Sequence, residues 1–208
     1  MKRENTPEFK PETTRMETFS DAVIAIVMTL LVLELKIPHI AKGAINAAFL
    51  SELYNQLPNF AGFALSFLVI AIFWVNHHQL FHALRATDGK LLWYNNHLLF
   101  WLCFIPFPTA FIGEYYDNLI TVMLYGFVLF MASVSFNMMG RYAYRTGLFK
   151  SNISDIVLKH SLKRGLFGPL VYSAATLSAF ISVYISIALF ILVPIFYFIP
   201  QKIVRMEN

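Results

Sequence analysis

The sequence predicts an all-α integral membrane protein with six membrane-spanning helices per subunit. Three observations support this: 58% of the 208 residues are hydrophobic, only 13% are charged, and the hydrophobic residues occur in long runs. A helix needs about 20 mostly apolar residues to cross a bilayer, so a chain of this length has room for about six crossings with short loops. The composition excludes a disordered chain and leaves no room for a separate soluble catalytic domain.

The apolar segments give the positions of the crossings. The first four are predicted at about residues 19–35, 57–84, 91–112 and 119–140. Residues 165–200 are too long an apolar stretch for one crossing at about 1.5 Å per residue, so we divide them into two spans with a turn near Ser182 to Ser186. Residues 1–14 carry prolines and mixed charges and are predicted to be a solvated tail, which leaves residues 15–208 as the transmembrane domain.

The distribution of basic residues predicts the orientation. Six crossings place both chain ends on one side, and that side then carries all the lysines and arginines except Lys36 and Lys42. By the positive-inside rule both termini are cytoplasmic, and we expect a location in a bacterial inner membrane. The opposite surface carries more acidic than basic residues and would mildly concentrate cations.

The start of the first span carries an unusual motif. Arg15, Phe19, Ser20 and Asp21 read R-x-x-x-F-S-D and are followed by the apolar run AVIAIVMTLLVLEL. An ionisable side chain inside a span is costly, so Asp21 should have a partner. Polar candidates lie at a matching depth, toward the cytoplasmic ends of the second and third spans: Trp74, Asn76, His77, His78, His82, Asn95, Asn96 and His97.

This motif, together with the region from Trp74 to His77, resembles the transmembrane protein 175 family of endosomal and lysosomal potassium channels, in its six-span prokaryotic form. The resemblance implies a homotetramer whose first helices line a central pore, permeable to potassium and other monovalent cations with modest selectivity. It implies a structural network that ties the first helix to the second and third, formed by Arg15, Phe19, Ser20, Asp21, Trp74, Asn76, His77 and Asn96. Membrane lipid is the other expected partner, and no cofactor is implied beyond the permeant ion.

The resemblance also implies where the pore narrows. Apolar side chains after the motif form the constriction in the family, and the matching positions here are Ile26, Leu30 and Leu33, with Thr29 beside them. Their i, i+4, i+7 spacing places the three apolar residues on one helix face. The sequence has no TVGYG-like stretch, so the expected filter and hydrophobic gate are side-chain rings rather than backbone carbonyls. Without the resemblance, the same stripe is more typical of a face that contacts lipid or other helices, since apolar stripes occur in any span.

Other interpretations use the polar residues of the spans differently. Asp21 and the histidines are alternatively the relay of an ion-coupled or proton-coupled transporter, or Asp21 forms an ion-binding ring at the inner mouth. His78 and His82 have the i, i+4 spacing of zinc ligands, but the second and third spans add only Asp88, in the loop between them. We therefore expect hydrogen-bonding histidines and no metal site. Catalytic motifs are absent, so we expect neither an enzyme nor a nucleic-acid-binding protein.

Overall fold

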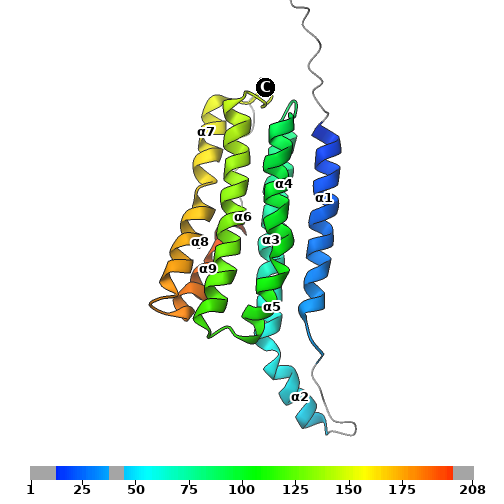
Figure 1. Cartoon of the computed structure of the whole chain (residues 1–208), viewed down its shortest axis with the longest axis vertical. Helices are drawn as coiled ribbons and strands as arrows, with labels where there is room; N and C mark the ends of the chain where they lie inside the picture. The colour runs from blue at the N-terminus through cyan, green and yellow to red at the C-terminus, as the bar shows by residue number, and fades with distance from the viewer. Residues whose placement is uncertain (1–12, 38–44, 199–208) are drawn as a thin grey trace, which may run out of the picture.

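The computed structural model describes residues 13–37 and 45–198, which form a bundle of helices (Figure 1). The elements are α1 (Thr13–Leu30), the 3₁₀ helix η1 (Leu31–Glu34), α2 (Asn46–Asn55), α3 (Leu57–Ala83), α4 (Gly89–Phe104), α5 (Pro106–Glu114), α6 (Leu119–Arg145), α7 (Asp155–Arg164), α8 (Phe167–Ser178) and α9 (Val183–Phe198). Only Thr13 and Thr14 of the predicted tail are described, and they begin α1. Lys42 and residues 199–200 of the last predicted span lie outside the described residues.

Within the described residues, four helical segments are long and apolar enough to cross a membrane: Thr13–Glu34, Leu57–Ala83, Gly89–Glu114 and Leu119–Arg145. They correspond to the first four predicted spans, although the first begins six residues earlier than expected. The third segment is divided into α4 and α5 at Ile105, because Pro106 and Pro108 have no backbone N–H to continue the hydrogen-bond ladder.

The last two predicted spans correspond to shorter helices. The turn between α8 and α9 lies at residues 179–182 rather than at Ser182 to Ser186. Ser186 is buried within α9, and its hydroxyl donates to the Ala175 carbonyl of α8 at 2.6 Å. The polar helix α7, which was not predicted, lies in line with α8 (Figure 1). Helix α2 was not predicted either.

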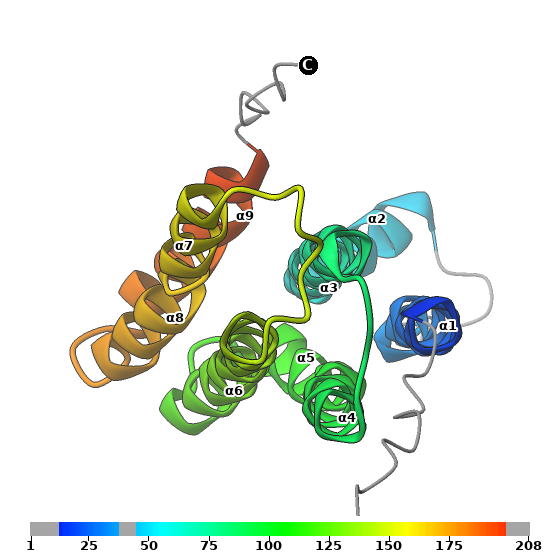
Figure 2. The ribbon, with the colours of Figure 1, turned by 90° about the horizontal axis from the view of Figure 1, so that it is seen from above.

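Helix α1 stands at one edge of the bundle. It packs against α3 and α4, whereas α6 packs between α4 and α8 on the other side (Figure 2). One side of α1 is therefore in contact with the rest of the subunit and the other side is uncovered.

The end of the bundle where α1 begins is closed by contacts between loops. The Arg85 N–H donates to the Leu148 carbonyl at 2.9 Å, and the Lys150 N–H donates to the Ala83 carbonyl at 3.0 Å. The Asp88 side chain caps α4 by accepting from the Leu91 N–H at 2.7 Å, and it also accepts from the Tyr142 hydroxyl at 2.7 Å. The α3–α4 and α6–α7 loops therefore form one connected surface.

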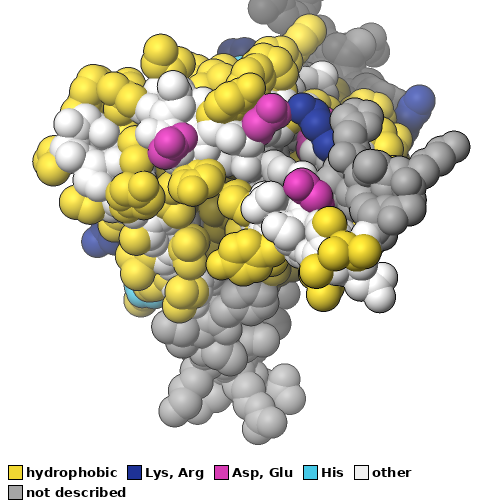
Figure 3. All heavy atoms as spheres, turned by 90° about the horizontal axis from the view of Figure 1, so that it is seen from below, with side chains coloured by type: hydrophobic (Ala, Val, Ile, Leu, Met, Phe, Trp, Pro, Cys, Tyr) yellow, Lys and Arg dark blue, Asp and Glu magenta, His cyan; other side chains and the backbone are white. Residues whose placement is uncertain are grey.

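Much of the outer surface is apolar, as a lipid environment requires. Large hydrophobic side chains are exposed on most of the helices, including Ile120 on α6 and Leu170 on α8. Seen from below, hydrophobic side chains dominate the outline of the molecule, and a few acidic side chains stand among them (Figure 3). Together with the four apolar segments, this surface is that of an integral membrane protein.

Replacing Asp88 with Ala should lower the free energy of unfolding by about 1–2 kcal/mol, because the substitution removes the α4 cap and the acceptor of Tyr142. Asp88→Asn keeps a capping oxygen and should lose less. Unfolding of the detergent-solubilised protein, followed by circular dichroism, measures both. Equal stability of the parent and both variants would contradict the role of this cap.

Candidate functional site

A buried chain of hydrogen bonds joins α1 to α4 and α3. His77 Nε2 donates to Asn95 Oδ1 at 2.9 Å, Asn95 Nδ2 donates to the Ser20 hydroxyl at 2.9 Å, and that hydroxyl donates to the Met16 carbonyl at 2.8 Å. Ser20, His77 and Asn95 are completely buried. Each hydrogen bond in this chain has one donor and one acceptor, so the three helices are joined by buried hydrogen bonds.

A second contact lies beside the first. The Trp74 indole N–H on α3 donates to Asp21 Oδ1 at 3.0 Å, which gives the motif carboxylate a charge-assisted hydrogen bond. We call the five residues Ser20, Asp21, Trp74, His77 and Asn95 the α1 clamp. The resemblance led us to expect Arg15 in the same network as Asp21. Arg15 is instead exposed, and no ion pair joins it to Asp21 in the described part of the chain.

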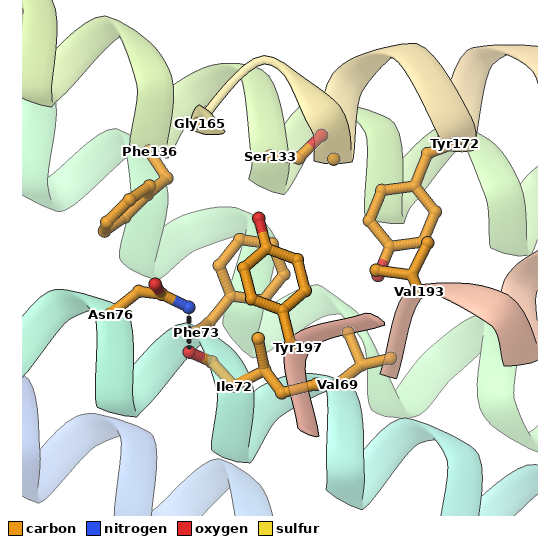
Figure 4. A pocket seen from close by; sticks show the side chains of 11 residues that line it. Val69, Ile72, Phe73, Asn76, Ser133, Phe136, Gly165, Tyr172, Val193 and Tyr197 are labelled. Carbon is orange, nitrogen blue, oxygen red and sulfur yellow. Dashed lines mark hydrogen bonds between the residues drawn. The ribbon is translucent and has the colours of Figure 1, made fainter. Parts of the chain in front are cut away.

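Two residues predicted for the network lie elsewhere. Asn76, the residue before His77 on α3, points away from α1. Its amide donates to the Ile72 carbonyl at 2.7 Å, and its side chain lines a small cavity of about 30 Å³ between α3, α6, α8 and α9 (Figure 4). Asn96 is exposed, and its neighbour Asn95 occupies the buried position instead. Consecutive residues differ by about 100° around a helix, so only one of the two asparagines can face α1. Phe19 is also exposed, at the surface of α1.

A third contact between α1 and α3 was not predicted. Glu17 Oε1 lies 3.1 Å from His78 Nδ1 and 4.0 Å from His82 Nε2. Glu17 is one helical turn before Asp21, so both carboxylates face α3. The i, i+4 spacing of Glu17 and Asp21 in the sequence would have indicated that both carboxylates lie on the same face of the first span.

These contacts set the rotation of α1 about its own axis. Met16, Ile24 and Val27 lie within about 40° of Ser20 around the helix and are buried with it. Ile26, Thr29 and Leu30 lie about 180° to 280° from Ser20 and are exposed. Ile26 and Leu30 are 57% and 44% exposed, and Leu33 is 71% exposed. The predicted constriction residues therefore form the uncovered side of α1, opposite the clamp.

The helix tightens where this stripe ends. The sequence predicts one α-helix through residue 35, but α1 ends at Leu30 and η1 continues as a 3₁₀ helix. Because a 3₁₀ helix has about three residues per turn, Leu33 comes to lie almost directly over Leu30. The two leucines are therefore more closely aligned around the helix axis than the α-helical spacing predicts.

Thr29 lies among these apolar side chains. Its hydroxyl donates to the Ile26 carbonyl of its own helix at 2.8 Å. The hydrogen is used in this bond, so the exposed side of the oxygen offers lone pairs, which can accept a hydrogen bond or coordinate a cation.

His97, the remaining histidine of the third span, is exposed on α4 and hydrogen-bonds to a neighbouring helix. The Trp101 indole N–H donates to His97 Nε2 at 3.2 Å, so Nε2 carries no proton, and Nδ1 contacts the Ser135 hydroxyl at 2.9 Å. His97 therefore ties α4 to α6 and does not approach Asp21.

The far end of the α1 segment is tied by an ion pair. Lys36 Nζ lies 2.8 Å from Glu114 Oε2 at the end of α5. The hydrogen bond to the Glu114 carboxylate raises the pKa of Lys36 above its ordinary value. The pair connects the segment after η1 to the end of α5, opposite the clamp.

The profile of a family described as endosomal/lysosomal potassium channel TMEM175 matches residues 15–106, which contain the whole clamp and the exposed stripe. A protein named potassium channel from Chryseobacterium sp. is 33% identical over 188 residues, which cover 90% of this chain and 93% of that protein. A second potassium channel, from Chamaesiphon minutus, is 33% identical over 193 residues, or 89% of this chain and 93% of that protein. The chain belongs to the TMEM175 family.

The solved structures agree with this membership. The crystal structure of a lysosomal potassium-selective channel TMEM175 homolog from Chamaesiphon minutus matches with a TM-score of 0.77 and 32% identity, covering 89% of this chain and 96% of that one. The agreement over nearly the whole length places α6 to α9, which lie beyond the matched profile, in the TMEM175 fold as well.

Replacing Asn95 with Ala should destabilise the protein by about 1–3 kcal/mol, because the donor on His77 and the hydroxyl of Ser20 lose their buried partner. The matched control is Asn96→Ala, one residue away on the exposed side, which should change stability little. Thermal unfolding in detergent compares the two. A larger loss for Asn96→Ala would contradict the assignment.

Replacing Glu114 with Gln should lower the pKa of Lys36 toward its ordinary value. A raised pKa in the folded state means that the pair stabilises the fold below the ordinary lysine pKa, and that this contribution disappears as the pH rises through the raised value. A lysine NMR titration of the intact protein measures the shift. Glu52→Gln is the control and should leave Lys36 unchanged; an unchanged Lys36 pKa in Glu114→Gln would contradict the pairing.

Proposed function

We propose that the chain forms a homotetrameric, potassium-permeable cation channel in which α1 of each subunit lines a central pore. The observation that supports this most directly is the exposed stripe of Ile26, Thr29, Leu30 and Leu33 on the side of α1 opposite the clamp. One helix cannot enclose a pore, so this function requires the α1 helices of several subunits around one axis. Relatives at 33% identity bear the name potassium channel, which supports the choice of ion.

The same proposal includes the arrangement in the membrane. The first four spans are the long apolar segments, and α8 and α9 are the fifth and sixth, with α7 extending α8 beyond the bilayer. The basic α3–α4 and α6–α7 loops lie at the end where α1 begins (Figure 1). The positive-inside rule then places this end and both termini in the cytoplasm of a bacterial cell.

The constriction is formed by rings of Ile26, Leu30 and Leu33 side chains. An apolar ring offers no oxygen to replace the hydration shell, so an ion passes by shedding only part of its water, and a narrow ring can also close by dewetting. Partial dehydration costs less for potassium than for the smaller sodium ion. Modest selectivity for potassium follows without a carbonyl filter.

Thr29 supplies the one polar ring of the stripe. Its lone pairs face outward because its hydrogen is bonded to the Ile26 carbonyl. A ring of such oxygens next to the apolar rings would hold water or a partly hydrated cation at the narrowest region.

The clamp contacts favour this function over the transporter alternative. Asp21 accepts from the Trp74 indole, and His77 is joined through Asn95 to Ser20, so these groups hold helices together. A proton relay requires groups that exchange protons in sequence. Trp74 and Asn95 interrupt such a sequence, because neither side chain takes up or releases protons in the physiological range.

Replacing Ile26 with Asn should raise cation flux through proteoliposomes and bring the potassium-to-sodium flux ratio close to one, because a hydrophilic ring spares the ion its partial dehydration. The measurement is potassium and sodium flux for the parent and the variant under the same gradient.

Ile120→Asn is the matched control, since it makes the same chemical change at an exposed position of α6, and it should leave flux unchanged. If a tetrameric Ile26→Asn variant has the selectivity and flux of the parent, Ile26 does not form the constriction. Potassium movement that requires a proton gradient would support the transporter instead.

A further inference from the structure

A cluster of metal-ligating side chains lies at the crossing of α1 and α3, outside the proposed pore stripe. We propose that Glu17, His78 and His82 bind one zinc ion per chain. One ligand atom from each residue, a carboxylate oxygen or an imidazole nitrogen, lies within 4.8 Å of the other two. This proposal does not depend on the channel function.

The distances suit a zinc ion after small side-chain movements. Zinc lies about 2.0–2.1 Å from imidazole nitrogen and about 2.0–2.2 Å from carboxylate oxygen, so ligand atoms in a tetrahedral site lie roughly 3.4 Å apart. Glu17 Oε1 is 3.1 Å from His78 Nδ1, close to that value, and 4.0 Å from His82 Nε2. His82 is the more exposed histidine, and a rotation of its side chain closes the remaining gap.

The binding atoms are available. His78 Nδ1 is buried and has no hydrogen bond of acceptable geometry in the described part of the chain, although Glu17 lies beside it. The His78 ring is stacked on Trp74, with ring centroids 5.9 Å apart, and Trp74 is itself held by Asp21. Such outer contacts fix the orientation of a ligating ring and favour metal binding.

The donor set points to zinc rather than to a hard cation. Two imidazoles and one carboxylate with an open fourth position are typical of zinc, whereas calcium and magnesium prefer oxygen ligands. The side chain of His82 is 64% exposed, so water can reach the fourth position. The carboxylate comes from α1 and not from the spans that carry the histidines, which is why the sequence did not favour a metal site.

A zinc ion here would connect α1 to α3 one turn before Asp21 and next to the clamp. It would add a bond between the two helices that is present only when the metal is bound. We therefore expect zinc to stabilise the folded protein against thermal unfolding.

The test is isothermal titration of the tag-free, full-length protein in detergent with zinc chloride. We expect one zinc ion per chain for the parent and an affinity at least about tenfold weaker for Glu17→Gln and for His82→Ala, since changes even in the outer contacts of a metal site typically cost that much. Zinc should raise the melting temperature of the parent and not that of His82→Ala. Magnesium chloride should produce neither effect.

His160→Ala is the matched control, because it removes another exposed histidine, on α7, and it should bind zinc as the parent does. His82 is exposed, so His82→Ala tests the site even where Glu17→Gln impairs folding. Absence of zinc binding by the parent at micromolar concentrations would overturn the proposal. Parent-like affinity in a folded His82→Ala variant would overturn it equally, because the zinc would then be bound elsewhere.

Discussion

The rotation of α1 is the constraint on which the proposed pore depends, and the buried hydrogen bonds from Ser20 through Asn95 to His77 fix it. In a bilayer, lipid is as apolar as a leucine side chain, so hydrophobic residues alone give a helix no preferred side. Leaving a buried polar group unpaired costs more than any single apolar contact provides. One rotation of α1 satisfies Ser20 and Asp21 together, and that rotation leaves Ile26, Leu30 and Leu33 uncovered.

The α1 segment is held near both ends by polar contacts, and between them the buried side chains of Ile24, Val27 and Leu31 pack against the bundle. The clamp and the Glu17 contacts hold its first turns against α3 and α4, and the pairing of Lys36 with Glu114 ties the chain just after η1 to α5. The exposed stripe lies between these two attachments. The change from α-helix to 3₁₀ helix also falls there, at Leu31, so the stacking of Leu30 and Leu33 depends on a local winding rather than on a side-chain contact.

The sequence predicted the long spans because their apolar content alone requires lipid. It also placed Ser20, Asp21, Trp74 and His77 in one network, since polar groups at one depth in neighbouring spans need partners. It included Arg15, Phe19 and Asn76 as well, which lie elsewhere. It placed Asn96 in the network where the structure has Asn95, because the choice depends on the rotation of α4, which packing sets. Helices α2 and α7 were missed: both are short, and α7 is too polar to show an apolar run. Glu17 was overlooked because its partners lie on another span.

The polar and apolar sides of α1 carry separate tasks in the proposed channel. The clamp uses Asp21 for attachment, whereas the exposed Arg15 lies about 220° from Ser20, on the side of the stripe but ahead of its first residue. The stripe itself, Ile26, Thr29, Leu30 and Leu33, carries no charged side chain. At the stripe, a permeating cation would meet side-chain methyl groups and the Thr29 oxygen. Discrimination between ions depends on the free energy needed to remove water from each ion, because the protein offers few oxygen atoms to replace that water. Selectivity is therefore limited and depends on the width of the ring. Small rotations of α1 would change the width of the ring, so the contacts that hold the helix also affect the ion selectivity of the pore.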